Sequence, residues 1–361
     1  MSVDTLSVEP VAPSESPDAS DGGEDFVALY DVLNRAVQFD LGLDHLRIEA
    51  AEMLPAWRNQ RYVARGGHLV RLGGIPAGAL QWSASREEGA RNLEFDLAAT
   101  GEARDHGVEE LLLRRLLDDA LELGRTALQT FSIHRVDTPG ERLGSPSGYG
   151  TLPLDHQSRF LLDNGFTLQQ VERNSTFDLR SPLDHVQGML DDALVHAGGE
   201  YALRSWTGAT PPQHVEAFAY VLPRMSTDVP LAGLDVPEEV WDAARVEHRD
   251  RRIAAGGRLT SVTAVEHLPT GRIVAYNELG IGPDRSRPTD QWGTLVLKEH
   301  RGRRLGTIVK CANLLRWAEL VPTSPFVSTF NAEENRPMLD VNEAIGFVPL
   351  TIGGAWQRTL A

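Results

Sequence analysis

A turn near the C-terminus stands out because its residue types suit an anionic ligand. Its residues are Arg301, Gly302, Arg303, Arg304, Leu305, Gly306 and Thr307. The arginines carry fixed positive charge, and the glycines let a bulky group approach the backbone closely. If a helix begins within this turn, its first backbone N–H groups have no internal partner and the helix dipole adds positive character. The turn therefore predicts a binding site for a phosphate or pyrophosphate group.

The segments on either side of the turn supply the elements that would position it. Residues 292–297 form an apolar run that predicts a strand ending in Leu295, Val296 and Leu297. After the turn, apolar residues recur at helical spacing and predict an amphipathic helix to about Leu320. A strand, a glycine-containing turn and a helix in this order are typical of proteins that bind phosphorylated ligands.

The same order of predicted elements occurs twice in the chain. Each copy contains a strand, an arginine-containing turn, a long helix, a strand, a short helix, a Gly-Phe pair and a last strand. The two Gly-Phe pairs are Gly165–Phe166 and Gly346–Phe347. Repeats of this length indicate tandem copies of one domain rather than a solenoid. We predict a disordered acidic tail over residues 1–25, a first domain over 26–180, a linker over 181–200 and a second domain over 201–361.

Composition narrows the class of protein. A single cysteine, Cys311, excludes a disulfide framework and a cysteine-based zinc site. The histidines are too far apart for a local metal motif, so we predict no metal cofactor. At 361 residues the chain is long enough for about two domains.

The charge of the chain bears on its partners. The formal net charge is −16, and eight acidic residues precede the first basic residue, Arg35. Non-specific nucleic-acid binding needs a basic surface, so we expect no nucleic-acid partner, whereas a small-molecule amine is compatible with this charge. No signal peptide is evident, and no apolar run approaches the roughly 18 residues of a membrane span. We therefore expect a cytoplasmic monomer or homodimer without membrane contact.

These features resemble the GNAT acyltransferase superfamily, whose members transfer an acyl group from acyl-CoA to an amine. The phosphate-binding turn of that family reads R/Q-x-x-G-x-G/A. Here Arg301 and Gly306 match the first and last positions, and Arg304 replaces the middle glycine. The tandem layout is similar to that of actinobacterial two-domain members. The resemblance implies an α/β fold with a mixed sheet in two tandem GNAT-like domains, and it is most specific over residues 255–350.

The resemblance also implies a cofactor and its contacts. Acetyl-CoA is the expected co-substrate, with its pyrophosphate on the turn 301–307 and its pantetheine arm along the backbone of residues 295–297. Asn331 and Asn335 match the asparagine-containing strand end and helix start of the family, which implies that they contact CoA.

The first copy differs from the second at the turn. Counting from Arg104, the position that matches Gly306 is occupied by Glu109. A carboxylate at this position would repel a pyrophosphate and obstruct the backbone. We therefore predict that the first domain is degenerate and that only the second binds acyl-CoA.

Two residues are candidates for the chemistry itself. A substrate ammonium has a reference pKa of about 10.4 and must lose a proton before it can attack a thioester. Glu278, in the middle of a predicted strand, is the candidate general base. The family often places a tyrosine four residues before the glycine of the Gly-Phe pair, where it protonates the departing thiolate. Here that position is Asn342, whose amide does not titrate.

Three functions are compatible with this pattern. The first is N-acetyltransferase activity toward a primary amine of a small molecule or peptide. The second is a non-catalytic acyl-CoA-binding or regulatory module, which the missing tyrosine favours. The third is acylation of an amino-sugar thiol precursor, as in mycothiol synthase.

Overall fold

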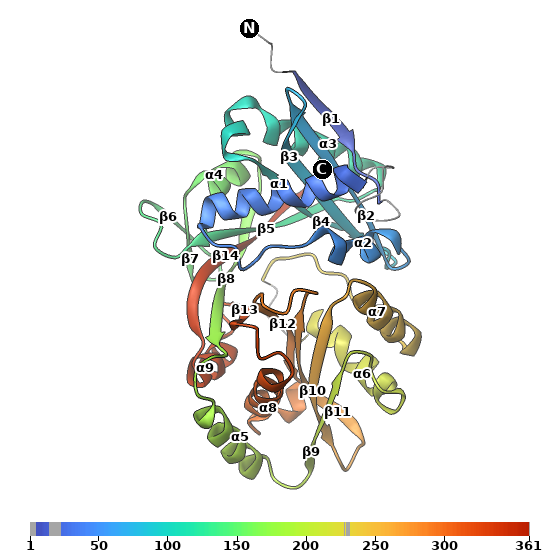
Figure 1. The fold of residues 1–361 in the computed structure, drawn as a ribbon, viewed down its shortest axis with the longest axis vertical. Coiled ribbons are helices and arrows are strands. Elements are labelled where there is room, and N and C mark those ends of the chain that lie inside the picture. Colours follow the sequence, from blue (N-terminus) through green and yellow to red (C-terminus); the bar gives the residue numbers. More distant parts are fainter. Residues whose placement is uncertain (1–4, 14–22, 227, 229–231, 361) are drawn as a thin grey trace. The chain divides into compact units, whose positions relative to one another are not determined.

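The computed structural model describes residues 5–13, 23–226, 228 and 232–360, which form two compact units (Figure 1). Unit 1 consists of Met1–Val171, Ala232–Pro237 and Ile352–Ala361, and unit 2 consists of Glu172–Leu231 and Glu238–Thr351. Both units combine helices with strands of a mixed sheet, so the predicted α/β class is confirmed.

Unit 1 is built on strands in sequential order. They are β1 (Leu6–Pro10), β2 (Val63–Leu72), β3 (Ile75–Ser85), β4 (Asn92–Ala99) and β5 (Ala127–Arg135). Neighbours from β1 to β4 are antiparallel, whereas β4 and β5 are parallel. The helices are α1 (Gly23–Leu41), α2 (Ala50–Arg58), η1 (Gly101–His106), α3 (Val108–Glu122) and α4 (His156–Asp163). A separate hairpin joins β6 (Arg142–Gly144) to β7 (Thr151–Pro153).

Both faces of the unit 1 sheet are buried. Leu69 and Ala79 pack into a core with α1 and α2, while their neighbours Val70 and Leu80 pack into a second core with α3. Successive side chains of a strand point to opposite faces, so two covered faces require apolar residues at adjacent positions.

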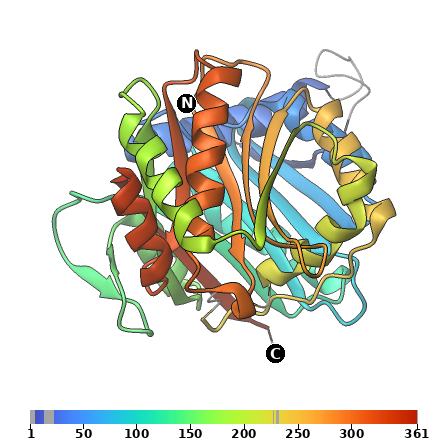
Figure 2. The same cartoon turned by 90° about the horizontal axis from the view of Figure 1, so that it is seen from below.

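Unit 2 repeats this plan. Its strands are β9 (Tyr201–Thr207), β10 (Leu259–His267), β11 (Arg272–Ile281), β12 (Thr289–Val296) and β13 (Phe326–Ala332). Its helices are α5 (Asp184–Ala197), η2 (Pro212–His214), α6 (Val215–Val221), η3 (Leu222–Ser226), α7 (Ala243–Ala255), η4 (Lys298–His300), α8 (Leu305–Leu320) and α9 (Arg336–Ile345). Figure 2 shows α5, α8 and α9 on one face of this unit's strands and α6 and α7 on the other. Only β12 and β13 form a parallel pair among the neighbours from β9 to β13.

The last strand of each repeat is divided between the units. The first residues of β8 (Thr167–Asp178) belong to unit 1, and the residues from Glu172 onward pair with β13 in unit 2. Conversely, β14 (Val348–Thr359) begins in unit 2, and its residues from Ile352 onward belong to unit 1. The two repeats therefore exchange the ends of their final strands, which a division of the sequence into consecutive domains cannot represent.

The predicted disordered tail is wrong for part of its length. Leu6–Pro10 form β1, which pairs with β2 throughout, and α1 already begins at Gly23. The alternation Leu6-Ser7-Val8-Glu9 directs two apolar side chains onto the unit 1 core. Residues 1–4 and 14–22 lie outside the described residues. The strand β1 therefore takes the place in the first repeat that β9 takes in the second, next to β2 and β10 respectively.

The predicted linker over residues 181–200 is also wrong. It contains α5, whose side chains Val186, Leu190 and Ala193 are buried in the unit 2 core with residues of α8. Because an amphipathic helix that buries its apolar face belongs to the core it covers, this segment is part of unit 2. Among the described residues, no helix combines the length and apolar character needed to cross a membrane.

The role of β1 can be tested with two neighbouring substitutions. Val8→Asp should lower the free energy of unfolding by about 1 to 2 kcal/mol, because it places a charge where an apolar side chain packs. Ser7→Asp introduces the same side chain on the exposed face and should have little effect. Chemical denaturation measures both, and equal stability of the two variants would mean that β1 contributes no packing.

Candidate functional site

The arginine- and glycine-containing turn lies directly before α8. Gly302 has a φ of 79°, and Arg304, which caps the helix, has a φ of 57° and a ψ of 21°. Both residues are therefore in the left-handed region, which glycine adopts without strain and other residues adopt at about 1 to 2 kcal/mol. Arg304 occupies the position at which the GNAT turn usually has its middle glycine, and the backbone keeps the conformation that glycine would favour.

This geometry leaves main-chain donors free at the start of the helix. The N–H of Ile308 donates to the carbonyl of Arg304 at 3.1 Å and completes the first helical turn. The N–H groups of Leu305, Gly306 and Thr307 have no hydrogen-bond acceptor within the described parts of the chain. A Cβ added at Gly306 would have only the Val296 side chain nearby, at 3.7 Å. The helix start is therefore open to an anion.

A groove of about 960 Å³ lies against this turn, entirely within unit 2. It is lined by these residues of the predicted CoA site: Leu295, Val296, Arg301, Gly302, Arg304, Leu305, Gly306, Thr307 and Asn335. Three other predicted contacts, Leu297, Arg303 and Asn331, are not among the lining residues. The remaining walls come from residues that the sequence reasoning missed, namely His196, Asp228, Thr294, Lys298, Glu334, Pro337, Met338 and Val341. The volume is in the range of ligand pockets, about 300 to 1,000 Å³.

The groove exists because β12 and β13 separate. Their parallel ladder has only two pairs, Thr289 with Val327 and Asp290 with Ser328. The register between β11 and β12 then shifts, so that two residues of β12 oppose Glu278 alone. Such a bulge bends its strand. Beyond it, residues 294–296 of β12 line the groove.

Buried polar side chains connect the two strands where their ladder ends. Gln291 on β12 donates to the Thr329 hydroxyl on β13 at 2.7 Å, and Lys310 of α8 donates to the Gln291 carbonyl oxygen at 2.9 Å. Burial lowers the pKa of Lys310 to about 7. These contacts replace main-chain hydrogen bonds that the separating strands can no longer form.

The groove carries several cationic groups near the turn. Arg301 donates to the carbonyl oxygens of Val296 and Asp228, at 3.3 and 3.0 Å, and Lys298 forms an ion pair with Asp228 at 3.4 Å. Arg304 is exposed and forms no ion pair within the described residues. Its guanidinium is therefore available to an anionic ligand. The described residues contain no group of three or more side chains suited to hold a metal ion.

The corresponding turn in unit 1 is occupied by its own side chains. Gly107 has a φ of 73° and caps α3 as Arg304 caps α8, so Glu109 corresponds to Gly306. The Glu109 carboxylate is buried and bonds to His156 at 2.8 Å, which raises the pKa of that histidine. Arg104 is held by both carboxylate oxygens of Asp40, at 2.8 and 2.7 Å. The positive groups of this turn are thus already paired.

Glu278 is not among the residues that line the groove. Its side chain is 2% exposed and forms an ion pair with Arg249 of α7 at 2.5 Å. Arg249 in turn lies over the Trp292 ring, 5.7 Å from its centroid. A carboxylate held by a buried guanidinium is poorly placed to take a proton from a substrate, because it would have to leave its partner. This geometry favours a structural role for Glu278.

Asn342 and Asn331 are brought together by the fold. The Asn342 amide is 1% exposed and donates to the Asn331 carbonyl oxygen at 2.6 Å. Neither residue lines the groove. The contact joins α9 to the end of β13 and so fixes one wall. Among the groove-lining residues there is no phenol or thiol that could donate a titrating proton.

A carboxylate that the sequence reasoning missed lies beside the groove. Glu172 of β8 is opposite Ala332 of β13, and Glu334, which lines the groove, is close enough to act on it electrostatically. Burial, with a smaller contribution from Glu334, raises the pKa of Glu172 to about 7. The residue belongs to the first repeat in sequence, so only the exchange of the final strands reveals its place in unit 2.

A parallel strand pair that separates beside a helix N-terminus, present in two copies, defines a tandem GNAT fold. No family model and no curated protein matches this sequence. The similarity is structural. A tandem GNAT protein from the clavulanic acid biosynthesis pathway, solved without acetyl-CoA, has a TM-score of 0.73 and 22% identity, with 98% of both chains covered.

Two further solved structures are similar in fold to this chain. A GCN5-related N-acetyltransferase from Sphaerobacter thermophilus has a TM-score of 0.60 at 13% identity, with 98% of this chain and 95% of that chain covered. The glucosamine N-acetyltransferase region of a fungal multi-domain GH3 β-N-acetylglucosaminidase has a TM-score of 0.59 at 14% identity; 98% of this chain and 38% of that one are covered. The chain therefore has the tandem GNAT fold predicted from its turn and repeat.

The left-handed conformation of Arg304 predicts an unusual order of stabilities. Arg304→Gly should be more stable than Arg304→Ala by about 1 kcal/mol, because only glycine avoids strain at positive φ. At Arg303, whose φ is not positive, the order should reverse. Both pairs remove the same charge, so thermal unfolding of the four variants isolates the backbone effect. Alanine being the more stable replacement at both positions would contradict the assigned conformation.

Proposed function

We propose that unit 2 is an N-acetyltransferase that uses acetyl-CoA to acetylate a primary amine of a small molecule or peptide. The observation that carries this proposal is the groove itself. It combines a helix start with free N–H groups, the unpaired guanidinium of Arg304 and the strand end 294–296. Acetyl-CoA contains the matching groups in the same order, a pyrophosphate followed by an amide-containing arm.

Each part of the groove has a task in this proposal. The pyrophosphate accepts hydrogen bonds from the N–H groups of residues 305–307 and an ionic contact from Arg304. The pantetheine amides bind along residues 294–296 as an added strand would. Apolar side chains of α9, among them Met338 and Val341, cover the opposite side of the arm. A β12 N–H directed at the thioester oxygen stabilises the charge that develops there.

Glu172 is the proposed general base in place of Glu278. The attacking amine must lose a proton, and a base works best when its pKa lies near the operating pH. Glu172 meets this requirement because its pKa is raised to about 7, and it lies next to the groove residue Glu334. Asn342 supplies no proton, so in this mechanism the departing thiolate takes its proton from solvent or from the acceptor nitrogen.

A non-catalytic acyl-CoA-binding module is the second candidate. The contact between Asn342 and Asn331 favours it, because an amide pair occupies the place where the family often has a titrating phenol. Release of free thiol from acetyl-CoA separates the two functions. A panel of aminoglycosides, polyamines and peptide N-termini covers the main classes of amine. Tight acetyl-CoA binding without thiol release for any amine would favour the module.

The binding site can be tested with one substitution and a matched control. Gly306→Glu should weaken acetyl-CoA binding by about 100-fold or more, because a carboxylate would face the pyrophosphate. An added Cβ would have only the Val296 side chain nearby, at 3.7 Å, so the fold should persist. Gly188→Glu makes the same change on the exposed face of α5, where a Cβ meets nothing within 4 Å, and should bind normally. Calorimetry should give one site per chain, and two equal sites would contradict the assignment to unit 2.

The proposed base predicts a specific dependence on pH. Since Glu172 must be deprotonated to accept a proton, activity at saturating acetyl-CoA should rise with pH through about 7. Glu172→Gln should lower the turnover rate by about 100-fold or more and remove this rise while leaving acetyl-CoA binding intact. Glu319→Gln, an exposed change on α8, is the control. If Glu278→Gln removed the rise and Glu172→Gln did not, the role would return to Glu278.

A further inference from the structure

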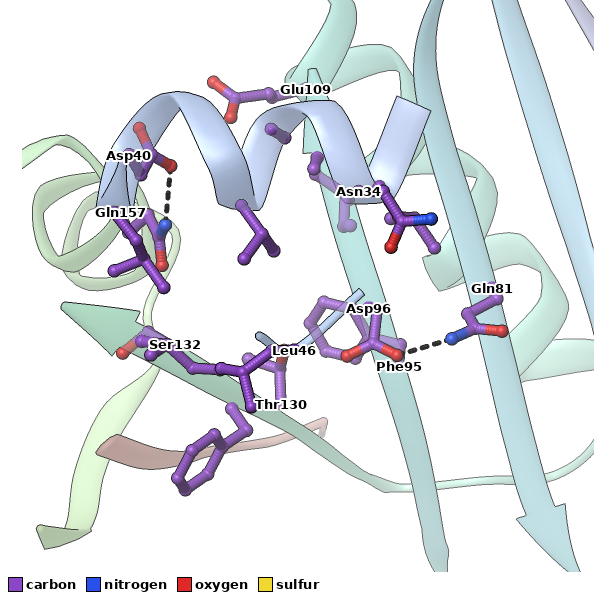
Figure 3. Close-up of a pocket in the computed structure, with 18 of the residues that line it drawn as sticks. Asn34, Asp40, Leu46, Gln81, Phe95, Asp96, Glu109, Thr130, Ser132 and Gln157 are labelled. Carbon is purple, nitrogen blue, oxygen red and sulfur yellow. Dashed lines mark hydrogen bonds between the residues drawn. The ribbon is translucent and has the colours of Figure 1, made fainter. Parts of the chain in front are cut away.

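A second cavity, of about 200 Å³, lies wholly within unit 1. Its lining includes residues of α1, of the segment that follows it, and of β3, β4 and β5 (Figure 3). The proposed acetyl transfer does not use this space. Most of its wall is apolar, with Leu33, Val37, Ile48 and Leu97 among the lining residues. Such a cavity is large enough for a small organic molecule, since one of about 150 Å³ binds benzene.

A directed chain of hydrogen bonds ends at a carboxylate in this cavity. The Trp57 indole donates to the Tyr30 hydroxyl at 2.9 Å, and Tyr30 donates to the Gln81 carbonyl oxygen at 2.8 Å. The Gln81 amide then donates to one oxygen of Asp96 at 2.6 Å. Because an indole N–H can only donate, the direction of every later bond is fixed. This series of hydrogen bonds therefore provides one donor to Asp96.

Asp96 keeps one oxygen without a hydrogen-bond partner among the described residues. The residue is exposed and lines the cavity, and Figure 3 shows it beneath α1. Burial raises its pKa, while its bond from Gln81 and the nearby Arg65 act in the opposite direction. A carboxylate beside apolar walls is stabilised by a ligand that brings both a positive charge and a donor.

The other charged groups of the wall are already paired. On the side of the cavity that carries Asp40 and Gln157 in Figure 3, Asp40 binds Arg104 through both oxygens and also accepts a bond from Gln157. Glu109 is bonded to His156. Asp96 is therefore the wall carboxylate that lacks a cationic hydrogen-bond partner among the described residues.

Neutral polar groups of the cavity wall, such as Asn34 and Ser132, also form hydrogen bonds within the protein. Asn34 exchanges two hydrogen bonds with the backbone of Ile48, at 2.8 and 2.9 Å, which holds the segment after α1 in place. Ser132 accepts from Trp356 at 2.8 Å and bonds to His134 at 2.6 Å, and His134 bonds to Asp155. This Ser-His-Asp arrangement uses both hydrogen-bonding functions of the serine, so the arrangement connects β5, α4 and β14 instead of presenting a nucleophile.

We propose that this cavity is a binding site for a small protonated amine with a compact apolar body, whose ammonium group bonds to Asp96. The volume admits a ring with an aminomethyl group, about eight non-hydrogen atoms. The site is independent of acetyl transfer, because unit 1 has no open anion site at its own turn.

Benzylamine is a suitable probe, with benzyl alcohol as its neutral counterpart. Calorimetry on the full chain should detect benzylamine binding at pH 7 and at least tenfold weaker binding of benzyl alcohol, because only the ammonium pairs with Asp96. Asp96→Asn keeps the shape of the side chain and should weaken benzylamine binding by at least tenfold. Equal affinity of the unmodified chain and Asp96→Asn, or no binding to the unmodified chain, would overturn the proposal.

Two further measurements keep the proposal testable if Asp96→Asn does not fold. Val37→Phe fills the cavity and should abolish binding, whereas Val195→Phe, on the exposed surface of α5, should not. In the unmodified chain, binding of an ammonium favours the charged carboxylate, so protons should be released on binding. Titrations in buffers of different ionisation enthalpy measure this release. Binding unaffected by Val37→Phe would place the amine elsewhere.

Discussion

The separation of β12 from β13 is the constraint on which the rest of unit 2 depends. Two parallel strands that stop pairing inside a protein leave main-chain groups without partners, and each such buried group is costly. Here the ladder ends after two pairs, and the contacts of Gln291, Thr329 and Lys310 join the strands at that point. These contacts join the strands where the ladder ends, and the β12 residues beyond that point line the groove.

The same topology has a different outcome in unit 1. There the parallel ladder of β4 and β5 has four pairs, and β4 pairs with β3 without a register shift. Glu109 fills the turn that is open in unit 2, and α1 encloses the space between the strands. A few local differences, namely the absence of a bulge, one carboxylate and one long helix, distinguish the cavity of unit 1 from the groove of unit 2. Both units thus retain a space at corresponding places of the fold.

The parts of the fold and of the candidate site that can be predicted from the sequence are those that depend on residues close together in the chain. The turn 301–307, the repeat and the contrast between Glu109 and Gly306 are local patterns, and the structure places them as expected. Membership of α5 in unit 2 depends on which core its apolar face covers, and β1 depends on an edge that only the fold provides. Both features depend on contacts between residues far apart in the sequence, whereas the local sequence predicts a linker over residues 181–200 and a tail over residues 1–25.

The surroundings of Glu278 are also a long-range property. The sequence indicates Glu278 because it lies mid-strand in the second repeat, but the partner that holds it, Arg249, comes from a helix nearly thirty residues away. Glu172 lies in the first repeat, and only the crossing of β8 into unit 2 brings it beside Glu334. Pattern reasoning finds residues that share a segment, whereas a base and its substrate site need not share one.

Arg304 has a left-handed backbone conformation that normally favours glycine. Glycine would adopt the left-handed conformation freely, and arginine adopts it at about 1 to 2 kcal/mol. In return the side chain is exposed beside the free N–H groups, without an ion pair in the described chain. A charge-assisted hydrogen bond is worth about 1.5 to 3 kcal/mol, so contact with a phosphate would offset the strain. Since that gain would exist only with a phosphate bound, arginine at this position would exchange stability of the free protein for affinity.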